Sequence, residues 1–178
     1  WQGGIQYISN IMHALDALAQ EHPVEILLFR HSAQNFSSLH DIKHTKVTEY
    51  NTEKVYPSWT FPNKVKWFLQ RKFSGRINPR MENFLLDLEV DFVFPATLSN
   101  CNNKLNAGSW IADFQYHNYP GGANKLVIKD TQQIIQNIAE NTEKIVLSSK
   151  FCEEECLNLF PGTKGKTFVM PFAVAIPE

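Results

Sequence analysis

Residues 110–120 read Trp-Ile-Ala-Asp-Phe-Gln-Tyr-His-Asn-Tyr-Pro, and the rest of the sequence supports this stretch. It begins as a short apolar strand, predicted over residues 109–112. It then carries a carboxylate, two amides, two phenols and an imidazole. Open α/β sheets bind ligands beyond the carboxyl ends of their strands, so we expect a site here. The alternative interpretation is a polar strand-to-helix loop, turned by Pro120 and the two glycines that follow it.

Short apolar runs and amphipathic patterns alternate along the chain on both sides of this stretch. The near-continuous apolar runs suit strands of a parallel sheet that is covered on both faces. The alternation predicts the α/β class: a Rossmann-like, doubly wound, mostly parallel sheet with right-handed crossovers and helices on both faces. Strands are predicted at 24–29, 46–49, 91–94, 109–112, 144–147 and 167–170, and helices at 8–19, 63–72, 79–88, 128–141 and 150–159.

Two glycines, Gly3 and Gly4, stand directly before the first amphipathic pattern. Free backbone N–H groups and the positive end of the helix dipole favour an anion such as phosphate at that place. A tight turn would also explain the two glycines. A glycine loop of this kind follows a strand that lies in the middle of a doubly wound sheet. We therefore expect the natural protein to have roughly ten more residues before Trp1.

Composition narrows the possible partners and the compartment. A formal net charge of −1 gives no general attraction to nucleic acid, which we do not expect as a partner. No apolar run approaches the roughly 20 residues that span a bilayer, and the first residues do not resemble a signal peptide. The three cysteines, Cys101, Cys152 and Cys156, have no neighbouring Cys or His at zinc spacing. This pattern predicts reduced structural thiols, no metal site and a cytoplasmic protein.

Aromatic and basic side chains alternate in residues 59–73. One interpretation is an interfacial helix over residues 63–72 that touches an anionic membrane or a charged acceptor. The protein would then be peripheral to the inner face of the membrane. The other interpretation is a helix that packs on the core while its lysine and arginine side chains snorkel to water.

Four stretches resemble, in their order along the chain, the N-terminal domain of GT-B glycosyltransferases of the large retaining group 1 (family 4). They cover nearly the whole chain. They are Trp1-Gln-Gly-Gly-Ile5 before a helix, Trp110-Ile-Ala-Asp-Phe-Gln115 with Pro120 close behind, Ile138-Ala-Glu-Asn141 leading to Lys144-Ile-Val-Leu-Ser-Ser149, and Val169-Met-Pro-Phe172.

The resemblance implies one half of a two-domain enzyme. In this family two Rossmann-like domains face each other across a cleft, and the C-terminal domain holds most contacts to the nucleotide sugar. Residues 1–178 would then be a single N-terminal, acceptor-side domain, and the C-terminal donor-binding domain would be absent from the chain. We expect such a domain to bind acceptor, to bind donor weakly and to be inactive alone.

The resemblance also implies roles for individual residues. Gly3 and Gly4 match the loop that approaches the donor diphosphate, where backbone N–H groups can neutralise the leaving group without a metal ion or other cofactor. Asp113 and His117 are the expected catalytic residues. The expected acceptor-binding residues are Gln115, Tyr116 and Asn118. Many relatives place a histidine directly after the glutamine, whereas this chain has Tyr116 there and His117 one position later.

The expected activity is transfer of a sugar, with retention, from a nucleotide-diphosphate sugar to a hydroxyl of a saccharide or lipid-linked saccharide. Two alternatives stay open. One is a non-catalytic module that binds a nucleotide or a carbohydrate, because the fold does not specify the function. The other is a sugar-nucleotide epimerase of the same two-domain build. A dinucleotide oxidoreductase is disfavoured because no G-x-G-x-x-G follows a strand.

Overall fold

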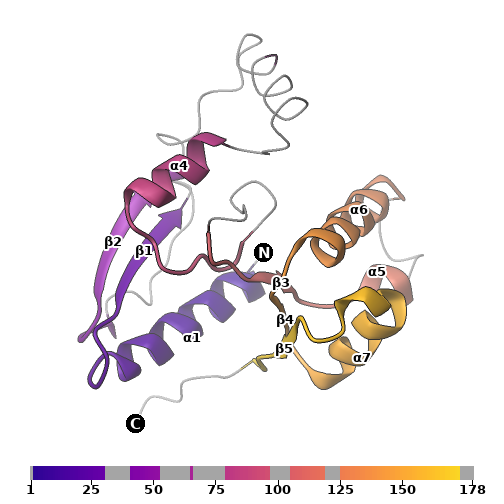
Figure 1. The fold of residues 1–178 in the computed structure, drawn as a ribbon. Coiled ribbons are helices and arrows are strands. Elements are labelled where there is room, and N and C mark those ends of the chain that lie inside the picture. Colours follow the sequence, from indigo (N-terminus) through magenta and orange to yellow (C-terminus); the bar gives the residue numbers. More distant parts are fainter. Residues whose placement is uncertain are drawn as a thin grey trace. The chain divides into compact units, whose positions relative to one another are not determined.

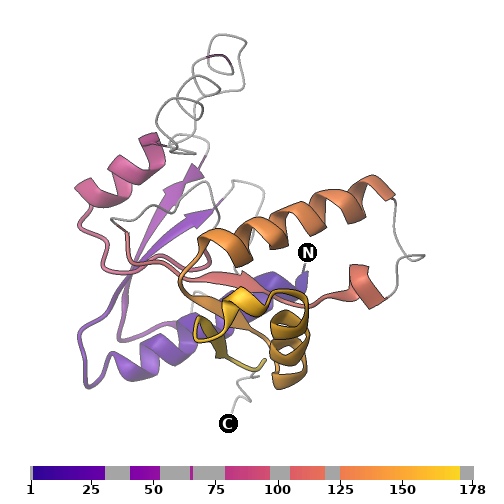
Figure 2. The ribbon, with the colours of Figure 1, turned by 45° about the vertical axis from the view of Figure 1, so that its right-hand side comes forward.

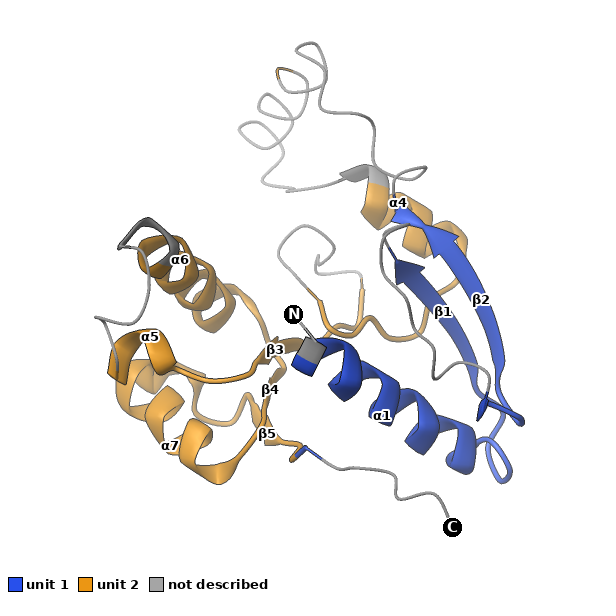
Figure 3. Ribbon diagram, turned by 180° about the vertical axis from the view of Figure 1, so that it is seen from behind, with its two compact units in different colours: residues 1–60, 172–178 blue, residues 61–171 orange. Residues whose placement is uncertain are grey.

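The computed structural model of the protein describes residues 2–30, 41–52, 65, 79–96, 105–118 and 125–172. The chain divides into two compact units, shown in Figure 3. Unit 1 comprises Trp1–Thr60 and Phe172–Glu178, and unit 2 comprises Phe61–Pro171. Helices and parallel strands occur in both units, so the prediction of the α/β class is confirmed. A single domain over residues 1–178 stays a prediction.

Unit 1 contains the helix α1 (Gln2–Leu18) and the parallel strands β1 (Glu25–Arg30) and β2 (Lys46–Asn51), labelled in Figure 1. Both strands were predicted at nearly these bounds. The rings of Phe29 and Tyr50, which lie opposite each other in the register, stack at 5.1 Å between centroids. Such cross-strand pairs stabilise a sheet and fix its register.

The inner face of α1 carries apolar side chains and one carboxylate. Tyr7 and Met12 are buried, and the ring of Phe172 packs edge-on against Tyr7 at 4.9 Å. Asp16 is also buried, and its oxygens accept hydrogen bonds from the backbone N–H groups of Lys43, His44 and Thr45 at 2.7–3.0 Å. The carboxylate therefore fixes the segment that leads into β2 onto α1.

Unit 2 is built on the strands β3 (Ser109–Ile111), β4 (Ile145–Leu147) and β5 (Thr167–Val169), which are parallel and lie in that order. Among the described residues the strands thus form two parallel sheets, β1-β2 and β3-β4-β5. One continuous, doubly wound sheet stays a prediction. The helices with described bounds in unit 2 are α4 (Pro79–Asp87), α5 (Gln115–Asn118), α6 (Lys125–Asn141) and α7 (Lys150–Leu159), with a 3-10 turn at Pro161–Thr163.

The core of unit 2 lies between its sheet and two helices, α6 and α7 (Figure 2). Because side chains alternate along a strand, Ile111, Ile145 and Leu147 all point to this side. They meet Ile135 and Ile138 of α6 and two thiols of α7. On the opposite side of the sheet, Phe168 of β5 is 53% exposed. The buried members of the core are Ile111, Phe114, Ile135, Ile138, Ile145, Leu147, Cys152 and Cys156.

The cysteines of α7 bear out part of the thiol prediction. Cys152 and Cys156 are four residues apart, both are buried on the core side, and both are free thiols. Burial raises the pKa of the Cys156 thiol, so its reactive thiolate is disfavoured. Cys101 lies outside the described residues.

The strand predicted at 91–94 was wrong. Only Val93 pairs, through an isolated parallel bridge to Ala107, although hydrogen bonds from Ala96 N–H to Gly108 O and from Gly108 N–H to Val93 O hold the segment in place. Pro95, which follows a cis peptide bond, has no N–H to give, so a regular ladder cannot continue past Phe94.

Two further predictions concern the membrane. In the part of the chain that the structure describes, no helix has both the length and the apolar character needed to cross a bilayer. The aromatic and basic segment 59–73 lies outside the described residues except for Val65, which is helical and exposed. The interfacial helix therefore stays a prediction.

Candidate functional site

The candidate site follows the carboxyl end of β3. Ala112 and Asp113 lead out of the strand, and Phe114, which is 1% exposed, anchors the chain in the core of unit 2. α5 then forms one helical turn. Its backbone is closed by hydrogen bonds from His117 N–H and Asn118 N–H to Phe114 O, at 2.8 and 3.3 Å. The stretch predicted as a polar strand-to-helix segment therefore contains a short helix of its own.

The neighbouring strand end ties Ala112 in place. The Ser148 hydroxyl, just past β4, donates to Ala112 O, and the Cys152 thiol donates to the same oxygen at 3.5 Å. Ser149 serves a different purpose, because its side chain accepts the Cys152 N–H at 3.1 Å and caps α7. The sequence gave no sign that Ser148 bonds the residue before Asp113.

Asp113 begins α5. Its Oδ1 accepts the backbone N–H of Gln115 at 3.1 Å, a local bond typical of aspartate at the start of a turn or helix. Asp113 is exposed. This carboxylate can thus keep the turn in shape and still accept a hydrogen bond from a ligand hydroxyl.

Tyr116 lies partly inside unit 2 and not at its surface. Its ring packs against the core and lies 6.3 Å from the Phe114 ring. Burial raises the pKa of Tyr116 to about 12, and the nearby Cys156, Glu155 and Asp113 add to the effect. The phenol is therefore neutral near physiological pH, and its largest contribution is to packing. Its predicted role in acceptor binding stays a prediction.

Asn118 is engaged by a residue that the sequence did not single out. Its Nδ2 donates to Oε1 of Glu155, in the second half of α7, at 2.6 Å. The partners are 37 residues apart. No local spacing or motif connects them, so only the packing of α5 beside α7 could reveal the pair.

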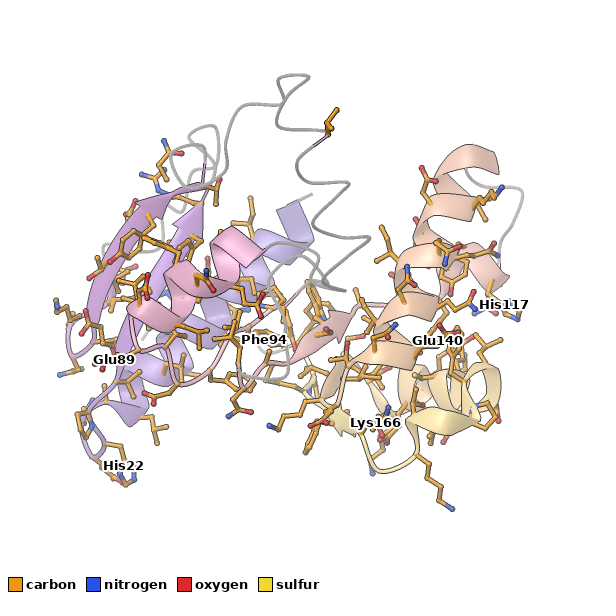
Figure 4. All side chains as sticks on the ribbon, turned by 45° about the horizontal axis from the view of Figure 1, so that its top comes forward. His22, Glu89, Phe94, His117, Glu140 and Lys166 are labelled. Atoms are coloured by element: carbon orange, nitrogen blue, oxygen red, sulfur yellow. The ribbon has the colours of Figure 1, made fainter. Side chains whose placement is uncertain are left out.

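Gln115 and His117 remain as outward-facing polar groups beside Asp113. Both are exposed, and Figure 4 shows the labelled His117 at α5, away from the strands of the sheet. A carboxylate, an amide and an imidazole are thus presented within five residues of one another. Together they can accept and donate hydrogen bonds to hydroxyl groups, and the imidazole or the carboxylate can accept a proton.

The prediction of a glycine loop before the first helix was wrong. α1 already begins at Gln2, so Gly3 and Gly4 lie in its first turn and not in a loop before it. Glycine disfavours a helix interior, but the burial of Tyr7 and Met12 outweighs that local preference. The first-turn N–H groups still lack acceptors within the helix, as the anion-binding hypothesis requires. Gly4 is buried, whereas Gly3 is exposed and a Cβ there would meet nothing within 4 Å.

Among the described residues, no group of three or more His, Cys, Asp or Glu side chains is arranged to hold a metal ion. No protein-family model, curated protein or solved structure matches this chain.

Proposed function

We propose that this chain is the acceptor-side, Rossmann-like half of a GT-B retaining glycosyltransferase. The observation that carries the proposal is the exposed set Asp113, Gln115 and His117, held on a short turn past a parallel strand. Ligand sites of α/β sheets lie at that position, and the polar groups are those that recognise sugar hydroxyls.

The proposed reaction breaks the bond between the sugar C1 and the diphosphate and forms a bond between C1 and the acceptor oxygen, on the same face of the sugar. The electron pair of the broken bond leaves with the diphosphate. The acceptor hydroxyl lies against Asp113 and Gln115, and His117 or Asp113 relays its proton. Tyr116 contributes a neutral phenol that supports the turn from the core side.

The first turn of α1 is the proposed partner of the donor diphosphate. Its unsatisfied N–H groups and the dipole of this 17-residue helix favour the negative charge that develops on the leaving group. This charge stabilisation needs no metal ion. An exposed glycine at position 3 lets the phosphates approach the backbone closely.

A second, donor-binding domain completes the proposed enzyme, so residues 1–178 alone would show little or no turnover. The proposed location is the cytoplasm. A lipid-linked saccharide acceptor would bring the enzyme to the inner face of the membrane, and the aromatic and basic residues of segment 59–73 are the proposed contact.

The acceptor side is tested by His117→Ala in the full-length protein. The assay follows release of nucleoside diphosphate from a panel of UDP- and GDP-sugars with added saccharide acceptors. We expect a loss of kcat of about 100-fold or more, the usual range for a proton-transfer group. The matched control is His22→Ala, an exposed histidine of the other unit, which should leave kcat unchanged. Unchanged turnover in both variants would remove His117 from the reaction.

The donor side is tested by Gly3→Trp, with Gly3→Ala as the control. The open space around Gly3 accommodates either side chain, but an indole would block the backbone N–H groups. We expect Gly3→Trp to abolish turnover and Gly3→Ala to retain most of it. Nucleotide-sugar binding by the wild type without any turnover or epimerised product would instead favour the non-catalytic binding module.

A further inference from the structure

The helix α5 is too short to be stable without outside support. A single helical turn fixes several residues for very few hydrogen bonds, so isolated turns do not persist in water. Two of the supports lie within the segment itself: Phe114 is buried, and Asp113 bonds the Gln115 N–H. Both act at the beginning of α5. His117 lies near the other end of this turn.

Further support comes from α7. The bond from Asn118 Nδ2 to Glu155 Oε1 is 2.6 Å long, and hydrogen bonds to a carboxylate are shorter and stronger than those between neutral groups. Glu155 stands on a well-fixed helix, because Cys152 and Cys156 on either side of it are buried in the core and Ser149 caps its start. A residue of a fixed helix thus holds the residue next to His117.

We propose that Glu155 is a positioning residue, which holds Asn118 and thereby fixes the turn that carries His117. The role in transfer rests on the proposed function above. It also gives Asn118 a structural role beside its predicted acceptor contact, because one Nδ2 hydrogen is donated to Glu155.

The structural part is tested by hydrogen exchange of the peptide spanning residues 114–118, whose amides include the two that bond Phe114 O. We expect Glu155→Ala and Asn118→Ala each to raise its exchange rate about five-fold, the effect of one lost hydrogen bond. The double variant should add no further increase, because both changes remove the same bond. Glu155→Gln keeps a carbonyl oxygen for Asn118 and should restore most of the protection.

The control is Glu154→Ala, which removes the same charge from an exposed neighbouring position on α7. It should leave the exchange of residues 114–118 unchanged. If Glu155→Ala behaves like Glu154→Ala, the bond does not fix α5 and the proposal is overturned.

The functional part is tested by turnover of the same panel of UDP- and GDP-sugars in the full-length protein. Glu155→Ala should lower kcat about ten-fold with the donor KM unchanged, because a displaced imidazole slows the reaction without loss of donor contacts. Glu155→Gln should recover kcat. A merely stabilising residue would not show this split or this rescue. Unchanged kcat in Glu155→Ala, together with a large loss in His117→Ala, would overturn the positioning role.

The exchange experiment and the turnover experiment test the role of Glu155 and the proposed function separately. If the wild type turns over none of the sugars, the proposed transferase activity and Glu155's role in it both fail. The exchange data still decide whether Glu155 fixes α5.

Discussion

At the scale of single residues, the strongest electrostatic feature of unit 1 is Asp16. Burial opposes its ionisation, but three backbone N–H groups outweigh that cost and lower the pKa of Asp16 to about 2. The bonds reach from 27 to 29 residues along the chain. The sequence shows Asp16 only as an acidic residue within a helical pattern, so its role could not be predicted. The same holds for Glu155. Asp113 was singled out in the sequence, and its catalytic role stays a prediction.

Replacement of Asp16 by alanine should therefore destabilise unit 1 in a pH-dependent way. The folded pKa lies below the ordinary value of 3.8, so the stabilisation is complete above that value and is lost as the pH falls toward about 2. Urea unfolding should give a lower midpoint for Asp16→Ala than for the wild type near neutral pH, and the gap should close in acid. Asp130→Ala, an exposed aspartate, is the control. A gap that stays constant with pH would contradict this account.

At the scale of elements, some helix ends were predictable from the sequence. Pro79 was predicted as the first residue of the helix at 79–88, and this prediction is confirmed. Ser149 caps α7, whose start at residue 150 was also predicted. Proline and serine act at the position they occupy, so their effect can be read locally. The end of α4 was less predictable. Val90 N–H bonds Leu85 O and Glu89 N–H bonds Leu86 O, a Schellman motif in which Glu89 has φ of 53°. Glycine usually fills that position.

Glu89→Gly should consequently stabilise unit 2. A residue with a Cβ costs about 1 kcal/mol in the left-handed region, and glycine removes this cost. Glycine also has more conformational freedom in the unfolded chain, which lowers the gain, so we expect a net stabilisation of about 0.5 kcal/mol. The measurement is the urea midpoint. Glu89→Ala removes the same charge but keeps the Cβ, and it should show no comparable gain. Equal effects in the two variants would assign the change to charge.

At the scale of the whole molecule, the alternation of elements predicted the class but not the division into two units. Strand positions came from apolar runs, which are local. The partners of each strand depend on contacts between distant residues. The pattern of apolar runs therefore does not distinguish a single sheet from two shorter sheets. Residues 91–94 show the same limit, because their apolar run favoured a strand, but only Val93 has a bridging partner, Ala107.

The division into two units predicts that a core substitution in one unit speeds amide hydrogen exchange in that unit alone. Leu147→Ala removes a fully buried side chain of unit 2, and Met12→Ala removes one of unit 1. Each should cost about 2–5 kcal/mol in its own unit. Hydrogen exchange followed by mass spectrometry should show faster exchange in β3, β4 and α7 for the first variant, and in α1 and β1 for the second. Faster exchange across both units in either variant would show a single cooperative unit.

The burial of Cys152 and Cys156 has a consequence for covalent chemistry. A maleimide or a similar electrophile can reach these thiols only when α7 separates from the sheet, since both side chains are at most 6% exposed. With Cys101 replaced by serine, the rate of alkylation would count openings of the core that supports α5. The alkylation rate of Cys152 and Cys156 would therefore report how often α7 separates from the sheet, the motion that would release His117.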